Sequence, residues 1–311
     1  MKYNKKILIS SYHMNLVLKD YSSILKKNKI SYDKIIKNPS VNEDQLLKVI
    51  EKYDGLICSD DEITKKVLDK AVKLKVISKW GTGIDSIDKK YAKLKKIKIC
   101  NTPNAFSRSV GQLTWAMILS LSRKMIETHE LIQRGNWPKL AGTSLEKKNL
   151  GIIGLGNVGQ AVIKMGAGFE MNVFGTDPKV VKKNILQKLK IKKISKKELI
   201  KKSDVIVLCV DLNKSSYNLI SDREFKNMKK NVILINISRG PVINEKSLIK
   251  ALKNKKISGL GIDVFTNEPL SKNNYLIKAK NCILSSHNAF NTSEQVKMVH
   301  KNTIMNIVKN L

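Results

Sequence analysis

Short apolar runs alternate along the chain with longer amphipathic stretches that are rich in lysine. A short apolar run fits a strand buried on both faces of a parallel sheet, and an amphipathic stretch fits the helix that crosses over to the next strand. In the first third of the chain the predicted strands are KKILIS (5–10), YDGLIC (53–58), KVIS (75–78) and KIKIC (96–100). In the middle they are LGIIGLG (150–156), MNVFGTD (171–177), DVIVLC (204–209), VILINIS (232–238), ISGLGIDVF (257–265) and NCILSS (281–286). The alternation predicts an α/β protein.

A long apolar segment, residues 109–125, separates the two groups of predicted strands. It is apolar on most faces and opens with Ser109, a residue type that commonly caps the N-terminus of a helix. We predict a single helix here, buried either in a domain core or in a subunit interface.

The glycines of LGIIGLGNVGQAV follow a predicted strand and precede a helical pattern. In a dinucleotide-binding turn, Gly154 would permit the tight bend, Gly156 would let the pyrophosphate approach, and Gly159 would let helix and strand pack closely. The pyrophosphate would then rest on the N-terminus of the helix. The next strand ends in Asp177, whose carboxylate suits the adenosine ribose hydroxyls and repels a 2′-phosphate, so we predict NAD rather than NADP. A strand–helix–strand unit without a ligand is the alternative.

Charged or titratable residues lie at the ends of three of the later predicted strands or just after them: Arg239, Asp263, Glu268 and His287. Ligands of parallel α/β sheets bind beyond the carboxyl ends of the strands, so these side chains are expected to converge. The set suits hydride transfer to or from a 2-hydroxy acid: the arginine holds the carboxylate, the histidine moves the proton, and the glutamate stabilises the charged imidazole. Taken singly, the arginine fits a surface turn, the glutamate a loop and the histidine a helix cap. Their joint order behind a dinucleotide turn favours catalysis.

Several motifs occur in a fixed order between about Leu56 and Thr292. They are KWGTGIDSID (79–88), NTPNAFSRSVGQLTWAMILSLSRK (101–124), RGNWPKLAGTSL (134–145), GIIGLGNVG, INISRGPVINEKSLIKALK, GLGIDVFTNEP and SHNAFNT. With them the sequence resembles the D-isomer-specific 2-hydroxyacid dehydrogenases. Through GTGIDSID and NTPN it is most similar to the phosphoglycerate dehydrogenase branch, without that branch's regulatory domain.

This resemblance implies two doubly wound, Rossmann-like parallel-sheet domains with a cleft between them. The substrate domain would be residues 1–100, completed by 288–311, and the NAD-binding domain residues 101–287. The family forms homodimers through its cofactor domains, which would give the apolar helix at 109–125 an interface to bury.

The resemblance also implies the roles of individual residues. The expected catalytic residues are Arg239, Glu268 and His287. The expected cofactor contacts are Gly154, Gly156, Asn157, Val158, Gly159, Asp177, Val210, Ile237, Ser238 and Asp263. The expected substrate contacts are Arg239 and the backbone of Trp80, Gly81, Thr82 and Gly83.

Three segments depart from the family pattern. The chain has CVDLN (209–213) where the family usually carries a histidine or another polar residue and then a proline, and it has Gly111-Gln112 in place of Ala-Glu. Ser59-Asp60-Asp61 stands where the phosphoglycerate branch has a substrate arginine. Two acids at that place would repel a phosphate. We expect selectivity among 2-hydroxy acids to reside in residues 10–14, 58–62 and 79–82.

The net charge of +33 first suggests a nucleic-acid binder. However, the chain has 54 lysines and 5 arginines, and its aromatic content is 5%. Proteins that bind nucleic acids favour arginine, which forms two parallel hydrogen bonds, and aromatic side chains, which stack on bases. The lysines here are instead spread over nearly every predicted helix. We therefore interpret the charge as a solvated surface that attracts anionic ligands, and expect neither a nucleic-acid partner nor a metal.

No apolar segment is long enough to span a bilayer, and the N-terminal apolar run, Ile7–Ile9, is too short for a signal peptide. The four cysteines, which lie far apart near the ends of apolar runs, are expected to be reduced, buried strand residues: Cys58, Cys100, Cys209 and Cys282. These features predict a cytoplasmic protein without a membrane partner.

The sequence therefore predicts an NAD-dependent D-2-hydroxyacid dehydrogenase. It would transfer a hydride between nicotinamide and C2 of a 2-hydroxy or 2-keto acid, with a phosphoglycerate-like acid as one option. The alternative from another class is a non-enzymatic, NAD-sensing scaffold like the transcriptional corepressors of the same fold, in which even the same triad occurs.

Overall fold

The computed structural model describes residues 3–37 and 40–311. Two compact units make up the chain. One comprises the chain through Phe106 together with Thr292–Leu311, and the other is Ser107–Asn291. We call them the split unit and the central unit. The boundaries expected from the sequence, at residues 100 and 287, lie a few residues before those of the two units.

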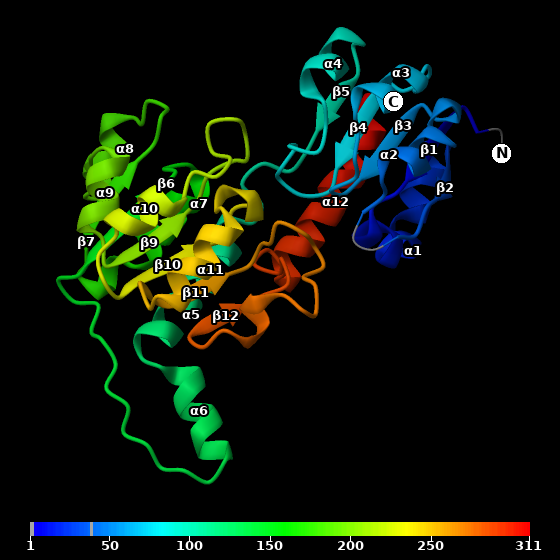
Figure 1. The fold of residues 1–311 in the computed structure, drawn as a ribbon. Helices are drawn as coiled ribbons and strands as arrows, with labels where there is room; N and C mark the ends of the chain where they lie inside the picture. Colours follow the sequence, from blue (N-terminus) through cyan, green and yellow to red (C-terminus); the bar gives the residue numbers. More distant parts are fainter. Residues whose placement is uncertain (1–2, 38–39) are drawn as a thin grey trace. The chain divides into compact units, whose positions relative to one another are not determined.

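The split unit is built on a five-stranded parallel sheet in the order β2-β1-β3-β4-β5 (Figure 1). Its strands are β1 (Lys5–Ile9), β2 (Ile30–Lys34), β3 (Gly55–Cys58), β4 (Val76–Lys79) and β5 (Lys98–Cys100). Its helices are α1 (Tyr12–Lys27), α2 (Glu43–Leu47), η1 (Ile50–Lys52), α3 (Lys65–Lys70), α4 (Lys89–Leu94) and α12 (Ser293–Asn310). The C-terminal helix α12 packs on this sheet: Ser78 Oγ donates to the carbonyl of Thr303 at 2.9 Å, and Val299, Ile304 and Ile307 are buried. This packing explains why the last residues of the chain belong with the first hundred.

Strand β2 was not predicted from the pattern. Its sequence, ISYDK, is half polar, and only Ile30 is buried. The strand lies at the edge of the sheet and pairs with β1 alone, so it needs no apolar residues on both faces. The other strand without an apolar run is β8, two exposed lysines at the edge of the second sheet.

The central unit contains a seven-stranded parallel sheet in the order β12-β11-β10-β9-β6-β7-β8. Its strands are β6 (Asn149–Ile153), β7 (Asn172–Thr176), β8 (Lys192–Lys193), β9 (Val205–Leu208), β10 (Val232–Asn236), β11 (Ile257–Ile262) and β12 (Cys282–Leu284). Its helices are α5 (Ser107–Ser122), α6 (Met125–Gln133), α7 (Asn157–Met165), η2 (Ala167–Phe169), α8 (Lys183–Lys188), α9 (Lys196–Lys202), α10 (Asp222–Asn227), η3 (Gly240–Val242), α11 (Glu245–Lys253) and η4 (Tyr275–Lys278). The chain runs outward from β6 to β8, then returns to β9 and runs outward to β12. Ligands of such doubly wound sheets bind where the order reverses, here at the carboxyl ends of β6 and β9.

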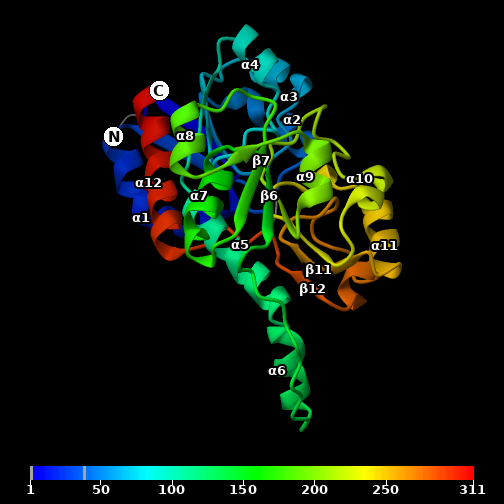
Figure 2. The same cartoon turned by 90° about the vertical axis from the view of Figure 1, so that its left-hand side faces the viewer.

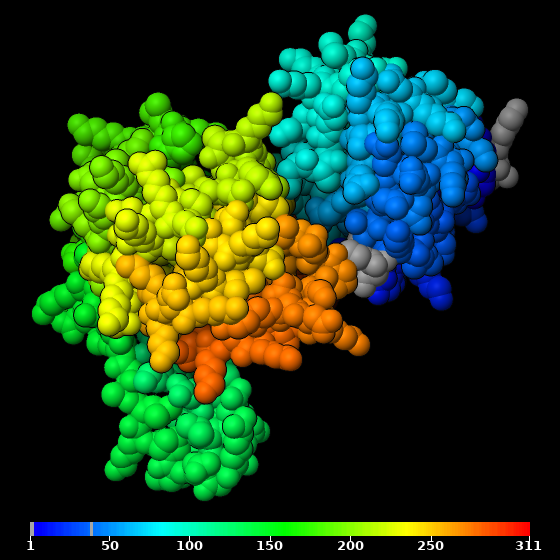
Figure 3. All heavy atoms as spheres, viewed as in Figure 1, coloured from blue at the N-terminus to red at the C-terminus, as the bar shows by residue number. Residues whose placement is uncertain are grey.

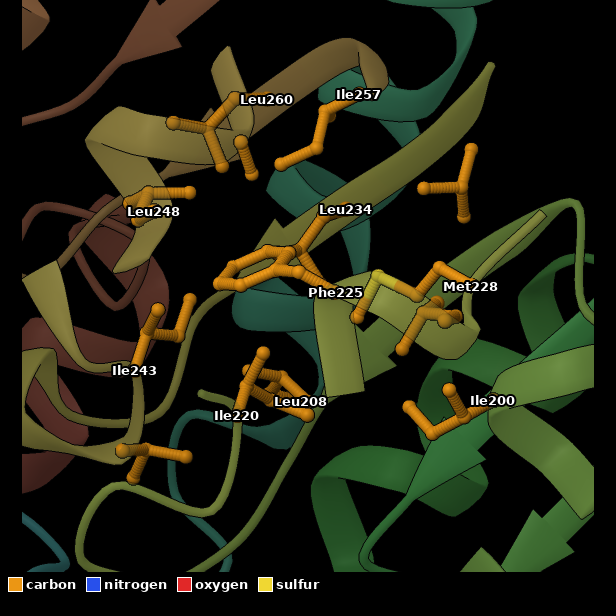
Figure 4. Packing of buried hydrophobic residues seen from close by; sticks show 14 of the residues in the cluster. Ile200, Leu208, Ile220, Phe225, Met228, Leu234, Ile243, Leu248, Ile257 and Leu260 are labelled. Atoms are coloured by element: carbon orange, nitrogen blue, oxygen red, sulfur yellow. The ribbon is translucent and has the colours of Figure 1, made fainter. Parts of the chain in front are cut away.

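Apolar layers on the two faces of this sheet hold the central unit together. Figure 4 shows Phe225, Leu234 and Leu260 packed with other buried residues of one cluster. A hydrogen bond joins helices α5 and α7: Trp115 Nε1 of α5 donates to the carbonyl of Val162 of α7 at 2.7 Å. A side chain at Gly166 would lie 1.8 Å from the Trp115 ring, so only glycine fits beneath the indole.

The long apolar helix differs from the single helix predicted for residues 109–125. Helix α5 begins at Ser107 and ends at Ser122, so Ser109 is buried inside its first turn and the cap prediction was wrong. Lys124 then adopts a left-handed conformation with φ of 53°, and α6 starts after it. An apolar pattern continues through such a break because one left-handed residue changes the direction of the chain without changing its composition.

Helix α6 and the chain that returns from it project from the central unit (Figures 1 and 2). None of the nine residues of α6 is buried. In the space-filling view the green segment that contains α6 stands out from the rest of the central unit (Figure 3). We call residues 125–144 the arm.

All four cysteines are free, but only Cys58 is fully buried, and Cys209 follows strand β9 rather than lying in it. The prediction that all four are buried strand residues was therefore wrong in these respects. Within residues 3–37 and 40–311, no helix is both long and apolar enough to cross a membrane.

Candidate active site

The glycine turn between β6 and α7 requires its first and third glycines for steric reasons. Gly154 has φ of 99°, and a Cβ there would lie 2.4 Å from the carbonyl oxygen of Cys209. A Cβ at Gly159 would lie 2.1 Å from the carbonyl oxygen of Gly154. Both backbones therefore approach their neighbours more closely than any side chain permits.

The second glycine of the turn leaves open space beside the N-terminus of α7. A Cβ at Gly156 would meet no atom within 4 Å, and Gly156 is exposed. It is also the N-cap of α7, and no side chain caps that helix end. The N-terminus of α7, where Asn157 and Val158 lie, thus faces an open surface, which suits an anionic pyrophosphate. These residues fit a dinucleotide.

Asp177 lies directly after β7 and beside the glycine turn. Its Oδ2 accepts from the N–H of Leu155 at 2.8 Å, and its Oδ1 accepts from the N–H of Lys179 at 2.8 Å. Each carboxylate oxygen can accept a second hydrogen bond. The half-buried carboxylate is therefore held by backbone while keeping acceptor capacity for ribose hydroxyls.

The remaining candidate cofactor contacts follow neighbouring strands of the same sheet. Val210 comes two residues after β9 and packs partly against the main core cluster. Ile237 and Ser238 come directly after β10 and are buried. Asn236, which the sequence analysis overlooked, accepts from the N–H and the hydroxyl of Ser238 and donates to the carbonyl of Arg239 at 3.0 Å. An amide at the end of an otherwise apolar strand was the signal that could have revealed it.

Arg239 follows this amide-bonded turn and is half-buried. Its Nη1 donates to the carbonyl of Ser238 at 2.8 Å, which holds part of the guanidinium close to the end of β10. A guanidinium presents its donors in a planar fork, a geometry that suits a carboxylate ligand.

Glu268 and His287 form a pair beyond the ends of β11 and β12. Nδ1 of His287 lies 2.8 Å from Oε2 of Glu268, and each side chain is 31% exposed. The other carboxylate oxygen accepts from the N–H of Phe265 at 2.9 Å. The glutamate is thus oriented by backbone, and it directs Nδ1 of the imidazole toward itself.

Asp263 organises the loop that carries the histidine. It is 1% exposed, and its two oxygens accept from the N–H groups of Asn288 at 2.8 Å and Ala289 at 3.1 Å. Its carbonyl accepts from the N–H of His287 at 2.7 Å, and His287 has φ of 54°. Asp263 thereby fixes a left-handed backbone at the histidine. Its expected contact with nicotinamide stays a prediction.

In the split unit, the candidate substrate loop follows β4. Trp80 is buried, and Gly81 has φ of 109°. The loop is held by hydrogen bonds from the N–H of Thr102 to the carbonyl of Gly81 and from Thr82 Oγ1 to the carbonyl of Thr102. Among the described residues, none accepts a hydrogen bond from the N–H of Gly81, Thr82 or Gly83. Those groups are therefore available to an acidic ligand.

The described part of the chain contains no group of three or more histidine, cysteine, aspartate or glutamate residues that could hold a metal ion.

Comparisons with known proteins identify the relatives of this chain. A family model described as D-isomer specific 2-hydroxyacid dehydrogenase, NAD binding domain, matches residues 115–289. A D-3-phosphoglycerate dehydrogenase from Methanocaldococcus jannaschii is 37% identical over 261 residues, covering 83% of this chain and 49% of that protein. A glyoxylate reductase from Thermococcus litoralis is 35% identical over 273 residues, covering 83% of this chain and 82% of that protein. A D-lactate dehydrogenase from Aquifex aeolicus, solved with NAD and lactic acid, has a TM-score of 0.87 at 27% identity, covering 97% of this chain and 94% of that chain.

The fold and these relatives place the chain among the dinucleotide-binding α/β oxidoreductases. The chain belongs to the D-isomer-specific 2-hydroxyacid dehydrogenase family, its cofactor is NAD, and the resemblance seen in the sequence is confirmed. It spans about half the length of the phosphoglycerate dehydrogenase and most of the length of the glyoxylate reductase.

Proposed function

We propose that this protein catalyses hydride transfer between NAD and C2 of a D-2-hydroxy or 2-keto acid, with Arg239, Glu268 and His287 as its catalytic residues. The observation that supports the proposal is the 2.8 Å contact between Nδ1 of His287 and Glu268, because it gives the two ring nitrogens different surroundings. With Nδ1 bonded to the carboxylate, Nε2 is the nitrogen that exchanges a proton with substrate.

Each side chain has a distinct role during reduction of a keto acid. Bound NADH supplies the hydride. Arg239 holds the substrate carboxylate through two parallel hydrogen bonds and orients C2. His287 donates a proton from Nε2 to the carbonyl oxygen as that oxygen becomes negative, and Glu268 stabilises the protonated imidazole beforehand.

We assign the central unit to NAD binding and the split unit to substrate binding. The cofactor residues are those of the glycine turn and the neighbouring strand ends: Gly154, Gly156, Asn157, Val158, Gly159, Asp177, Val210, Ile237, Ser238 and Asp263. In the split unit the N–H of Trp80 donates to the carbonyl of Cys58, so the N–H groups of Gly81, Thr82 and Gly83 are the ones assigned to the substrate carboxylate. In the central unit we assign Arg239 to the same ligand. We also assign the protein to the cytoplasm, which the four free cysteines support.

The test is NADH oxidation by the purified protein with a panel of 2-keto acids that includes glyoxylate, pyruvate and 3-phosphohydroxypyruvate. Turnover of at least one acid by the wild-type protein, and its loss in His287→Ala with NADH still bound, is expected. NADH binding without turnover of any acid would instead support the NAD-sensing scaffold.

We further propose that the protein forms a homodimer through the arm. Met125, Ile126 and Ile132 of α6 are exposed, and Trp137 is 83% exposed. Residues 99–138 contain only one of the 54 lysines, Lys124, although α6 is entirely unburied. Protein interfaces are poor in lysine and rich in methionine and tryptophan, so this composition suits a covered surface.

A second copy of the chain is the proposed occupant because an open hollow lies at the base of the arm. An open hollow of about 650 Å³ lies between the end of α5, residues 142–146 and residues 168–170. An arm that docks beside the same region of its partner would make a two-fold, self-complementary interface. A nine-residue helix is also marginal in water without such packing.

Sedimentation velocity at micromolar protein tests the dimer. Ile126→Asp should shift the protein toward monomer, because the side chain lies on α6 and supports no core. Ile277→Asp is the matched control, since Ile277 is exposed to a similar degree but lies in η4. A wild-type monomer, or a dimer that Ile126→Asp leaves intact, would contradict the proposal.

A further inference from the structure

An ion pair stands at the carboxyl ends of β3 and β4 in the split unit. Lys79 Nζ lies 3.0 Å from Oδ1 of Asp60 and also donates to the carbonyl of Trp80 at 3.2 Å. The two partners differ sharply in exposure: the Lys79 side chain is 5% exposed and that of Asp60 is 57% exposed. A buried ammonium is thus neutralised by a carboxylate that itself faces solvent.

A second acid next to the pair adds negative charge. Asp61 is fully buried, and its carboxylate accepts from Ser10 Oγ at 2.6 Å, the N–H of Val41 at 2.7 Å and the N–H of Ser59 at 3.3 Å. Burial raises the pKa of Asp61, and these hydrogen bonds and Lys79 partly oppose that rise. When Asp61 is ionised, the Lys79 ammonium is close to two negative carboxylates. When Asp61 is neutral, it is close to one. In neither state does this cluster offer an uncompensated positive charge.

The pair adjoins the proposed substrate loop. Lys79 is the last residue of β4, residues 80–83 follow it, and its ammonium is bonded to the first carbonyl of that loop. In a 2-keto acid the substituent on C2 is only two bonds from the carboxylate carbon. A substrate held by this loop through its carboxylate therefore carries its substituent within a few bond lengths of this stretch of chain.

We propose that the Asp60–Lys79 pair selects substrates by charge, favouring 2-keto acids with a small uncharged substituent over those that carry a second anion. This inference rests on the proposed function and names its substrate class. A phosphate or second carboxylate would have to displace Asp60 from Lys79, and both anions would then compete for one cation. An uncharged substituent leaves the pair intact.

The experiment compares kcat/KM for glyoxylate and for 3-phosphohydroxypyruvate, with NADH, in wild type and in Asp60→Asn. Wild type should favour glyoxylate. Asp60→Asn removes the counter-ion and leaves Lys79 charged, so the ratio should move about tenfold toward the phosphorylated acid, mainly through KM, and the shift should shrink at high salt. Asp44→Asn, which removes an exposed carboxylate from α2 in the same unit, is the matched control and should leave the ratio unchanged.

A second variant separates selection by charge from a general effect on the loop. Asp60→Asn/Lys79→Met lacks both charges and should return to a preference for glyoxylate. The ratio of kcat/KM for glyoxylate to that for 3-phosphohydroxypyruvate is measured on wild-type protein, so the proposal stays testable if a variant fails to fold. A wild-type preference for the phosphorylated acid, or an unchanged ratio in folded Asp60→Asn, overturns the selection. Wild-type protein that reduces no acid overturns the proposed function instead.

Discussion

Replacing Arg239 with lysine tests the carboxylate clamp without changing the net charge. The guanidinium is half-buried and is steadied by the 2.8 Å bond from Nη1 to the carbonyl of Ser238. Lysine offers a single ammonium on a flexible stem, so it loses both that bond and the planar two-point contact with a substrate carboxylate.

The magnitude follows from the bonds that are lost. A hydrogen bond to a charged group contributes about 1.5–3 kcal/mol, and each 1.4 kcal/mol corresponds to about a tenfold change in rate. Loss of one substrate bond, together with poorer orientation of the remaining contact, should therefore lower kcat/KM by about 100-fold, or about 3 kcal/mol of transition-state binding.

The assay is steady-state NADH oxidation with the best acid of the panel, alongside NADH binding followed by fluorescence. The affinity for NADH should change little. Arg223→Lys is the matched control, because it makes the same substitution at an exposed position of α10 in the same unit and should keep wild-type kinetics. Normal turnover by Arg239→Lys would refute the clamp, and an equal fall in both variants would point to a general effect of the substitution.

The other predictions concern the proton, the cofactor and acid stability. Glu268→Gln removes the charge that stabilises the protonated imidazole, so the reduction rate should begin to fall at lower pH than in wild type. His287→Ala should be inactive at every pH. If His287 only caps a helix, both variants should instead have a lower melting temperature, and the pH profile of Glu268→Gln should match that of wild type. Asp177→Ala should let NADPH replace NADH, and equal use of both cofactors by wild type would contradict the assignment. Burial, with a smaller contribution from His13, lowers the pKa of His300 to about 4 from its ordinary value of 6.5, so between these pH values the unfolded chain binds the proton that the folded chain excludes. Stability should then fall by up to about 3 kcal/mol as the pH drops from about 6.5 to 4, and His300→Phe should flatten that dependence in urea unfolding; an equally steep dependence in the variant would exclude this histidine as its source.

Local signals in the sequence were sufficient for the architecture and for the positions of the candidate residues. A strand buried on both faces is apolar along most of its length, so every central strand of both sheets was predicted. The glycine turn was equally readable, because Gly154 and Gly159 tolerate no side chain where they stand. Both signals can be read from a few consecutive residues.

Only the tertiary structure decided how residues far apart in the chain pair. The edge strand β2 is stabilised by its pairing with β1 and not by its own composition, and the break at Lys124 leaves the apolar pattern intact. The contacts that matter for chemistry join residues distant in sequence: Glu268 with His287, Asp263 with the loop at Asn288, and Asp60 with Lys79. The sequence shows two acids at 60 and 61 without showing that one is buried and the other neutralises a lysine. Charge at a site is a sum over neighbours in space, and those neighbours are brought together only when the strands align their carboxyl ends.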